Sequence, residues 1–320
     1  MHASQTEHPQ RRSRAAGSEV EVDTWSIMTQ ILASVESIRE FRIWQVMLSG
    51  ICASGLAMGL AQASLARSDD YWAAAQLAAV LFFTFYATNA AGILMMDRAR
   101  GQSRRDVLDA FQDALGSAHR LILTVCIVLA AMAVVCGALL GLLWLCRPGG
   151  AGALLYALIS PLIVVSIGML GLVLFAVVIP LTAPAVWSGA RTLDCVHILW
   201  WMVRNRLLLC VLLSGVLAGF TALVGTIASA VVLGSGWVMA QASLVVLHLD
   251  IPAPMLMIGL LGRSVASLGQ VQVPTSDAPY LYASIVGGGV VFALALVPPA
   301  LVYMRGVCAI FLGLTRSRGA

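Results

Sequence analysis

Six long apolar runs constrain this chain more than any other feature of its sequence. Each run lacks Asp, Glu, Lys and Arg. Each is also long enough to cross about 30 Å of hydrocarbon as a helix that rises about 1.5 Å per residue. The runs span residues 43–65, 73–96, 121–146, 151–181, 207–233 and 281–304. We therefore predict an all-α, polytopic membrane protein with six transmembrane helices.

The composition excludes the other broad classes of protein. Apolar residues make up 60% of the 320 positions, charged residues make up 11%, and the mean hydropathy is +0.92. A soluble domain carries roughly a quarter charged residues, so a soluble or disordered chain does not fit. The 7 cysteines include no Cys-x-x-Cys pair and most lie inside the apolar runs, which is typical of small buried side chains.

The distribution of arginine predicts the orientation. All 19 basic residues are Arg, a usage typical of GC-rich bacterial genomes, and all but Arg67, Arg147 and Arg263 are cytoplasmic if the N-terminus is cytoplasmic. We expect a protein of the bacterial inner membrane with both termini in the cytoplasm. Residues 1–23 mix acidic and basic side chains, which predicts a disordered tail before a single transmembrane domain at 24–315.

Amphipathic segments precede the first, third and fifth runs. From Ser103 apolar residues recur three or four positions apart, and Ser103 with Asp106 fits a capping box. We expect three units, 24–96, 97–186 and 187–308, each with a cytoplasmic interfacial helix followed by a transmembrane hairpin. The expected apolar stripes are Met28, Ile31, Leu32, Val35 and Ile38; Val107, Ala110, Phe111, Ala114, Leu115 and Ala118; and Leu193, Val196, Leu199, Trp200 and Val203.

Glycine pairs spaced four apart occur in the first span of each unit. They are Gly55 with Gly59, Gly137 with Gly141, and Gly215 with Gly219. Such pairs favour close helix packing in lipid, although a glycine-rich chain also contains some by chance.

The second amphipathic segment carries a resemblance. Residues 97–115 read DRARGQSRRDVLDAFQDAL, an Asp-to-Gly turn followed by an Ala- and Leu-rich helix that leads into a span. This arrangement resembles the bacterial YciC and glycerophosphodiester-phosphodiesterase membrane-domain families. The resemblance covers residues 24–315 and implies a six-helix inner-membrane domain, but it implies no activity.

Few polar side chains are placed to contact a substrate or a gate. Asn89 is the most polar side chain within a span, and it is either a substrate contact or an interhelical hydrogen bond. The outer insertion 234–279 contains His248 and Asp250. Since Gly234 and Gly236 interrupt its apolar pattern, residues 237–261 either form a re-entrant hairpin or lie on the outer surface.

Enzyme signatures are missing from the sequence, which has no nucleophile elbow, zinc motif or phosphate-binding loop. We expect no catalytic residue, metal or cofactor. The predicted function is a non-enzymatic accessory or scaffold that contacts anionic membrane lipids and other inner-membrane proteins, with no role in nucleic-acid binding. The alternative is a small-molecule or lipid transporter with a site between the repeats. The candidate lipid-headgroup contacts are Arg104, Arg105, Arg120, Arg204 and Arg206.

Overall fold

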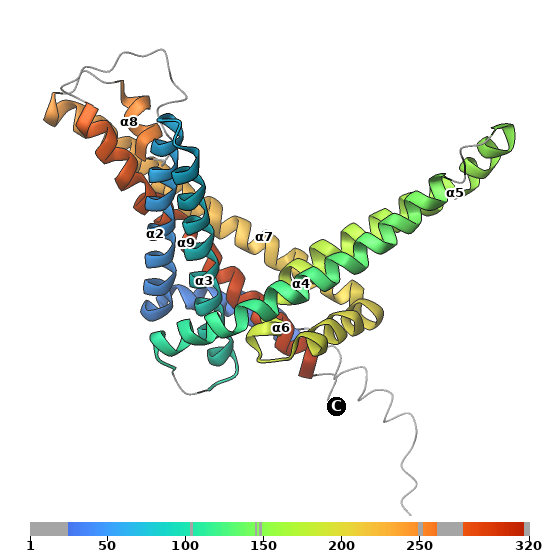
Figure 1. The fold of residues 1–320 in the computed structure, drawn as a ribbon. Helices are drawn as coiled ribbons and strands as arrows, with labels where there is room; N and C mark the ends of the chain where they lie inside the picture. The colour runs from blue at the N-terminus through green and yellow to red at the C-terminus, as the bar shows by residue number, and fades with distance from the viewer. Residues whose placement is uncertain are drawn as a thin grey trace, which may run out of the picture.

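Helices make up nearly all of the described chain (Figure 1). The computed structural model describes residues 25–102, 105–144, 146, 149–248, 252–260 and 278–316. A helical segment at 25–32 leads into η1 (Ala33–Arg39), α2 (Phe41–Ala66), α3 (Asp70–Ala99), α4 (Val107–Trp144), α5 (Gly149–Val173), η2 (Leu174–Val178), α6 (Ile179–Trp187), α7 (Thr192–Leu247), α8 (Ala253–Leu260) and α9 (Ala278–Arg316).

The predicted number of membrane-spanning helices is confirmed. Within the described residues, 6 helical stretches are long and apolar enough to cross a membrane. They are Phe41–Leu65, Asp70–Ala99, Val107–Trp144, Leu155–Trp187, Thr192–Leu247 and Ala293–Arg316.

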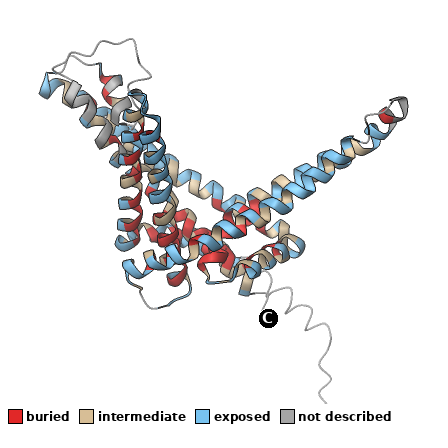
Figure 2. Cartoon of the chain, in the orientation of Figure 1, coloured by how far each residue is buried: buried red, intermediate tan, exposed pale blue. Residues whose placement is uncertain are grey.

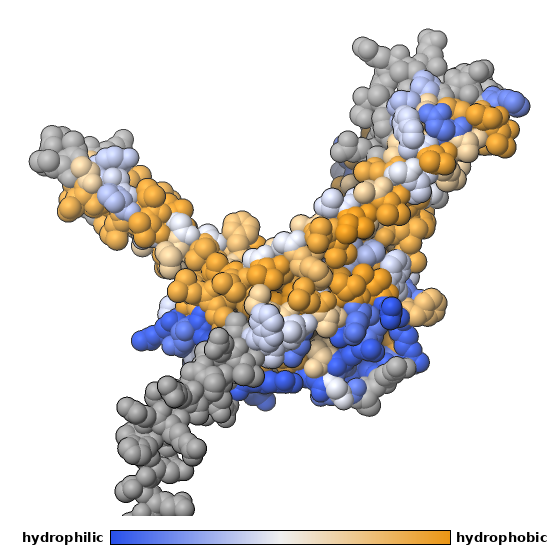
Figure 3. Space-filling view, turned by 180° about the vertical axis from the view of Figure 1, so that it is seen from behind, coloured by the Kyte–Doolittle hydropathy of each residue, from blue (hydrophilic) through white to orange (hydrophobic). Residues whose placement is uncertain are grey.

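Two arms rise from a common base (Figure 1). One arm contains α2, α3, α8 and the first part of α9, and the other is the α4–α5 hairpin. The first turns of α2 and α4 and the last turns of α3, α6 and α9 meet at the base. Figure 3 shows that hydrophilic surface gathers on this base and that apolar surface covers much of both arms.

The buried core lies at the base, around the second half of α9 (Figure 2). In the most apolar window of Ala293–Arg316, 56% of the residues are buried, against 6% in that of Val107–Trp144. The α4–α5 arm is therefore largely outside the core. The largest fully buried side chains are Ile31, Met95, Met96, Val177, Leu181, Met202, Leu213, Leu217, Val297, Leu301, Ile310 and Leu314.

Two helices end at the base with a glycine in the left-handed conformation. Gly101 after α3 has φ of 70° and Gly189 after α6 has φ of 83°. The backbone N–H of Gly101 donates to Arg98 O at 2.9 Å, and that of Gly189 donates to Val186 O at 2.9 Å. Since only glycine adopts this conformation without a Cβ penalty, these residues turn the chain back at the base.

A π-helical turn, η2, separates α5 from α6 within one span. Pro180 follows it and has no backbone N–H with which to bond the carbonyl four residues earlier, at Ala176. The Ser214 hydroxyl of α7 donates to that carbonyl, Ala176 O, at 2.9 Å. The bulge therefore ties α7 to the end of the fourth span.

Helix α7 differs from the prediction in its second half. Its backbone is non-helical at Arg206, with φ of −139° and ψ of 26°, so the helix changes direction where the interfacial segment meets the span. It then continues without a break to Leu247, and the expected interruption at Gly234 and Gly236 is wrong. An isolated glycine costs a helix only about 1 kcal/mol, and Ser235 Oγ donates to Val231 O at 2.9 Å within the same turn.

The segment before α4 also differs from the prediction. The sequence predicts an interfacial helix that is distinct from the third span, but α4 is one continuous helix from Val107 to Trp144. Ser103, the expected cap, lies outside the described residues. Asp106 remains at the start, where its carboxylate accepts the Val107 N–H at 2.8 Å. Among the stripe residues Ala110, Ala114 and Ala118 are buried, whereas Leu115 is exposed.

The other two stripes are rotated from the predicted faces. Ile31, Ser34 and Ser37 are buried before the first span, whereas Leu32 and Val35 are exposed. Residues 33–39 form a 3₁₀ helix, which repeats every three residues and so brings positions 31, 34 and 37 onto one side.

Before the fifth span, Cys195, Leu199 and Met202 are buried, and Leu193 and Trp200 are exposed. Leu199 therefore lies on the expected face, and the rest of the buried face comes from positions outside the predicted stripe.

Close helix contacts occur at glycines outside the predicted pairs. A Cβ added at Gly59, Gly137, Gly141, Gly215 or Gly219 would meet no atom within 4 Å. A Cβ at Gly50 would lie 2.1 Å from Ala87 Cβ, so α2 and α3 approach each other closely at Gly50 and Ala87.

We predict that Gly50→Ala lowers the unfolding free energy by about 1–3 kcal/mol, because the new methyl group overlaps the short side chain of Ala87. Gly59→Ala, in the same helix but facing open space, is the matched control and should be neutral or stabilising. Circular dichroism during titration of the detergent-solubilised protein with sodium dodecyl sulfate measures both variants. Equal effects would contradict the close contact.

Candidate functional site

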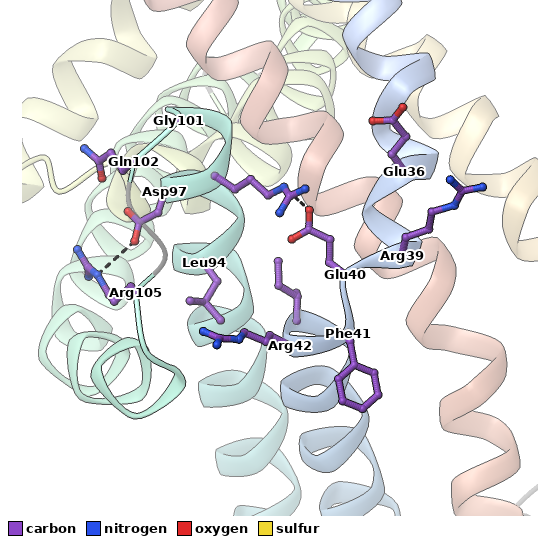
Figure 4. Close-up of a pocket in the computed structure, with 12 residues that line it drawn as sticks. Glu36, Arg39, Glu40, Phe41, Arg42, Leu94, Asp97, Gly101, Gln102 and Arg105 are labelled. Atoms are coloured by element: carbon purple, nitrogen blue, oxygen red, sulfur yellow. Dashed lines mark ion pairs between the residues drawn. The ribbon is translucent and has the colours of Figure 1, made fainter.

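A cavity of about 730 Å³ opens at the base between η1, the start of α2, the end of α3 and the turn after it (Figure 4). Charged side chains dominate its lining, with four arginines and three carboxylates. They are Arg39, Arg42, Arg98, Arg105, Glu36, Glu40 and Asp97. Such a lining favours a charged or strongly polar ligand over an apolar one.

Ion pairs hold the walls of this cavity together. Arg98 of α3 pairs with Glu40, which lies between η1 and α2. Arg105 lies with its Nε 3.2 Å from Asp97 Oδ2 and also pairs with Asp113 of α4. Asp97 is only 8% exposed, and a buried carboxylate is tolerated only when it is paired. These pairs therefore tie the first three spans to one another at the base.

Two further arginines extend the polar network to later parts of the chain. Arg305 Nη2 of α9 lies 3.9 Å from Glu36 Oε2, and Arg100 Nη1 donates to Ser188 O at 3.1 Å. Arg39 and Arg42 line the cavity and are exposed. Neither has an ion-pair partner within the part of the chain that the structure describes.

Asn89 contributes to helix packing at some distance along α3 from the cavity. Its Nδ2 donates to Phe85 O at 2.8 Å, and its Oδ1 accepts the indole N–H of Trp187 at 3.0 Å. Gly92, one turn later, makes room for that indole, since a Cβ there would lie 2.3 Å from Trp187 Cε2. Both polar atoms of the buried amide are thus engaged between α3 and α6.

The other predicted site residues are dispersed. Arg105 lines the cavity, whereas Arg120 and Arg204 are exposed and Arg206 is half-buried at the kink of α7. Arg104 lies outside the described residues. The structure therefore brings only Arg105 of this group into a site with other charged side chains.

His248 ends α7 in the left-handed conformation, with φ of 50°. Asp250, its expected neighbour in the insertion, lies outside the described residues. The short helix α8 packs against α7 and α9, and Gly236 lies beside Met257, where a Cβ would be 3.4 Å from Met257 Sδ.

Most of the cavity could not be predicted from the sequence. Glu40 and Asp97 are more than fifty positions apart, so no local pattern places them together. A signal was nevertheless present in residues 39–42, an Arg-Glu-Phe-Arg run directly before the first span, which was interpreted only as a topology signal. The described residues contain no group of three or more His, Cys, Asp or Glu side chains that could hold a metal ion.

No protein-family model, curated protein or solved structure matches this chain. The resemblance to the YciC and glycerophosphodiester-phosphodiesterase membrane-domain families stays a prediction.

We predict that Arg105→Gln lowers the unfolding free energy by about 1–3 kcal/mol, because it leaves the buried Asp97 carboxylate without its cation. Adding Asp97→Asn to Arg105→Gln should restore part of the loss. Arg42→Gln, from the same cavity but without an ion-pair partner among the described residues, should have no effect on stability. Chemical denaturation in detergent measures all three. A loss of stability in Arg42→Gln as large as that in Arg105→Gln would contradict the assignment.

Proposed function

We propose that this chain is a non-enzymatic accessory or scaffold of the bacterial inner membrane, which contacts anionic lipid at its base and partner membrane proteins through its α4–α5 arm. The observation that carries this proposal is the arm itself. It projects away from the rest of the molecule, and most of its residues are exposed or half-buried, with few buried (Figure 2).

The physics of lipid explains why such an arm points to a partner. Apolar surface is not driven out of hydrocarbon, so helices associate there by close packing and hydrogen bonds. Most of α4 has little of this packing within the chain. Gly137 and Gly141 lie on the arm with open space beside them, and small residues at this spacing allow another helix to approach closely.

The base supports the lipid part of the proposal. Arg120 and Arg204 are exposed there, close to where the apolar stretches begin. An arginine near an anionic leaflet contributes on the order of 1 kcal/mol to attraction. A base with several such residues would be held against the cytoplasmic surface.

The orientation and the threefold organisation belong to the same proposal. We infer that the base faces the cytoplasm, with both termini there, and that units 24–96, 97–186 and 187–308 each begin with an interfacial segment. The support is a change of backbone direction at Glu40 before α2 and at Arg206 in α7. The continuous α4 has no such break.

The transporter alternative is less well supported. It requires a polar contact available to a substrate, and Asn89 was the candidate within the spans. Asn89 is only 4% exposed, and its amide is engaged by Phe85 O and by the Trp187 indole, so its side chain is not presented to a substrate.

The proposed orientation predicts the activity of fusions to alkaline phosphatase, an enzyme that is active only outside the cytoplasm. A fusion after residue 110 should be inactive, and a fusion after residue 148, between α4 and α5, should be active. Green fluorescent protein at the same two positions gives the reciprocal control. The opposite pattern would overturn the proposed orientation.

We predict that a photoreactive p-benzoylphenylalanine in place of Leu140, which is 66% exposed on α4, forms adducts with another protein in native membranes. The same probe in place of Leu81, which is 72% exposed on α3, should react only with lipid. Gly137→Leu with Gly141→Leu should remove the protein adduct, because the larger side chains block close approach. Mass analysis of the adducts measures all of these outcomes.

The scaffold proposal fails if position 140 gives only lipid adducts, as expected for position 81. It also fails if both positions give the same protein adducts, since these would report random collision in the membrane.

A further inference from the structure

Two smaller hollows continue from the charged cavity along α2. The first, of about 240 Å³, shares Arg39 and Phe41 with the cavity and adds Trp44 and Leu48. The second, of about 390 Å³, shares Leu48 with the first and ends at Cys52, with Phe111 of α4 as one wall. We call these two hollows the α2 groove.

The character of the lining changes along this path. The cavity is lined mainly by charged side chains, and the first hollow is lined by one arginine among mostly apolar and aromatic side chains. The described residues that line the second hollow include no charged side chain. Phe41, at the junction, is 72% exposed, and aromatic side chains favour the headgroup level of a membrane. The path therefore runs from a polar to an apolar environment, as a membrane lipid does.

The charges at the polar end favour an anion. Glu40 is paired with Arg98, Asp97 with Arg105, and Glu36 with Arg305. Arg39 and Arg42 therefore remain as uncompensated cations among the described lining residues, and Figure 4 shows them on either side of Phe41. Arginine matches the geometry of a phosphate group.

The length of the α2 groove fits one leaflet. From Arg42 to Cys52 the helix rises about 15 Å at about 1.5 Å per residue, which is half of the roughly 30 Å hydrocarbon thickness. A partner helix would also fit an apolar groove, but it would not explain cations that lack a counterion at one end.

We propose that the cavity and the α2 groove bind one anionic phospholipid, with the phosphate at Arg39 and Arg42 and an acyl chain along α2 as far as Cys52. This inference deepens the proposed function, since it rests on a base that lies at a membrane surface. It assigns a defined site to residues other than the arginines proposed above for general lipid attraction.

The test measures the rate at which N-ethylmaleimide labels Cys52 in the purified full chain in detergent. Cys52 is half-buried at the end of the groove, and Cys126, exposed on α4, is the control within the same molecule. Added palmitoyl-oleoyl phosphatidylglycerol should slow labelling of Cys52 several-fold and leave Cys126 unchanged. Phosphatidylcholine with the same acyl chains should have little effect on the labelling rate. Glycerol phosphate, which has the anionic group but no acyl chain, should also have little effect.

The double variant Arg39→Gln, Arg42→Gln should raise the phosphatidylglycerol concentration needed for protection by about tenfold or more, as expected from the loss of two arginine contacts near a phosphate. Arg191→Gln, an exposed arginine directly before α7 that the proposal gives no lipid contact, should leave it unchanged.

Equal protection by the two lipids, protection of Cys126 as well, or no protection at all would overturn the site. These results need no variant and no membrane orientation. The proposal of a lipid site can therefore be contradicted while the fusion pattern supports the proposed function. The fusion pattern can likewise contradict the proposed orientation while the labelling supports the lipid site.

Discussion

The separation of charge from hydrocarbon is the constraint on which the rest of this structure depends. An ionised side chain at the centre of a bilayer costs at least about 2.5 kcal/mol, so the charged residues lie at the ends of the apolar stretches. Charged ends of several of these stretches lie together at the base, where hydrophilic surface gathers (Figure 3). Most of the buried core and the ion pairs described above lie there. The base therefore contains most of the buried core and also carries the most hydrophilic surface (Figure 3).

A second constraint acts on the backbone inside the apolar region. Each carbonyl freed by a helix irregularity needs a donor from within the protein, because lipid offers none. Ser214 supplies the donor for Ala176 O beside the π-helical turn, and Trp187 completes the bonding of Asn89. Both contacts join α6 or its preceding turn to another span. Asn89 and Ser214 therefore act as links between helices, where apolar packing alone would allow several registers.

These two constraints explain how far the sequence predicts the fold. Six spans follow from hydropathy, because the absence of charge over more than twenty residues has almost no other explanation. Breaks within the helices were harder to predict. The change of direction at Arg206 coincides with the predicted boundary between the interfacial segment and the span, whereas Gly234 and Gly236 leave the helix unbroken, since tertiary packing overrides weak local preferences. The cavity could not be predicted from the sequence, because Asp97 and Glu40 come together only when α2 and α3 have paired.

The uneven distribution of packing supports a division of roles within one chain. Contacts at the base hold α2, α3, α6, α7 and α9 together, and α4 joins them through its first half, where Ala110, Ala114, Ala118 and Thr124 are buried. Beyond Val128, the last α4 residue that packs against the core, few side chains of the helix are packed, so its movement would break few contacts. An element anchored at one end and unpacked along the rest can adapt to another helix without disturbing the core. The base can then hold a lipid through Arg39 and Arg42 while the α4–α5 arm engages a partner, because α4 lines the groove only in its first turns, at Val107 and Phe111, and not along its projecting part.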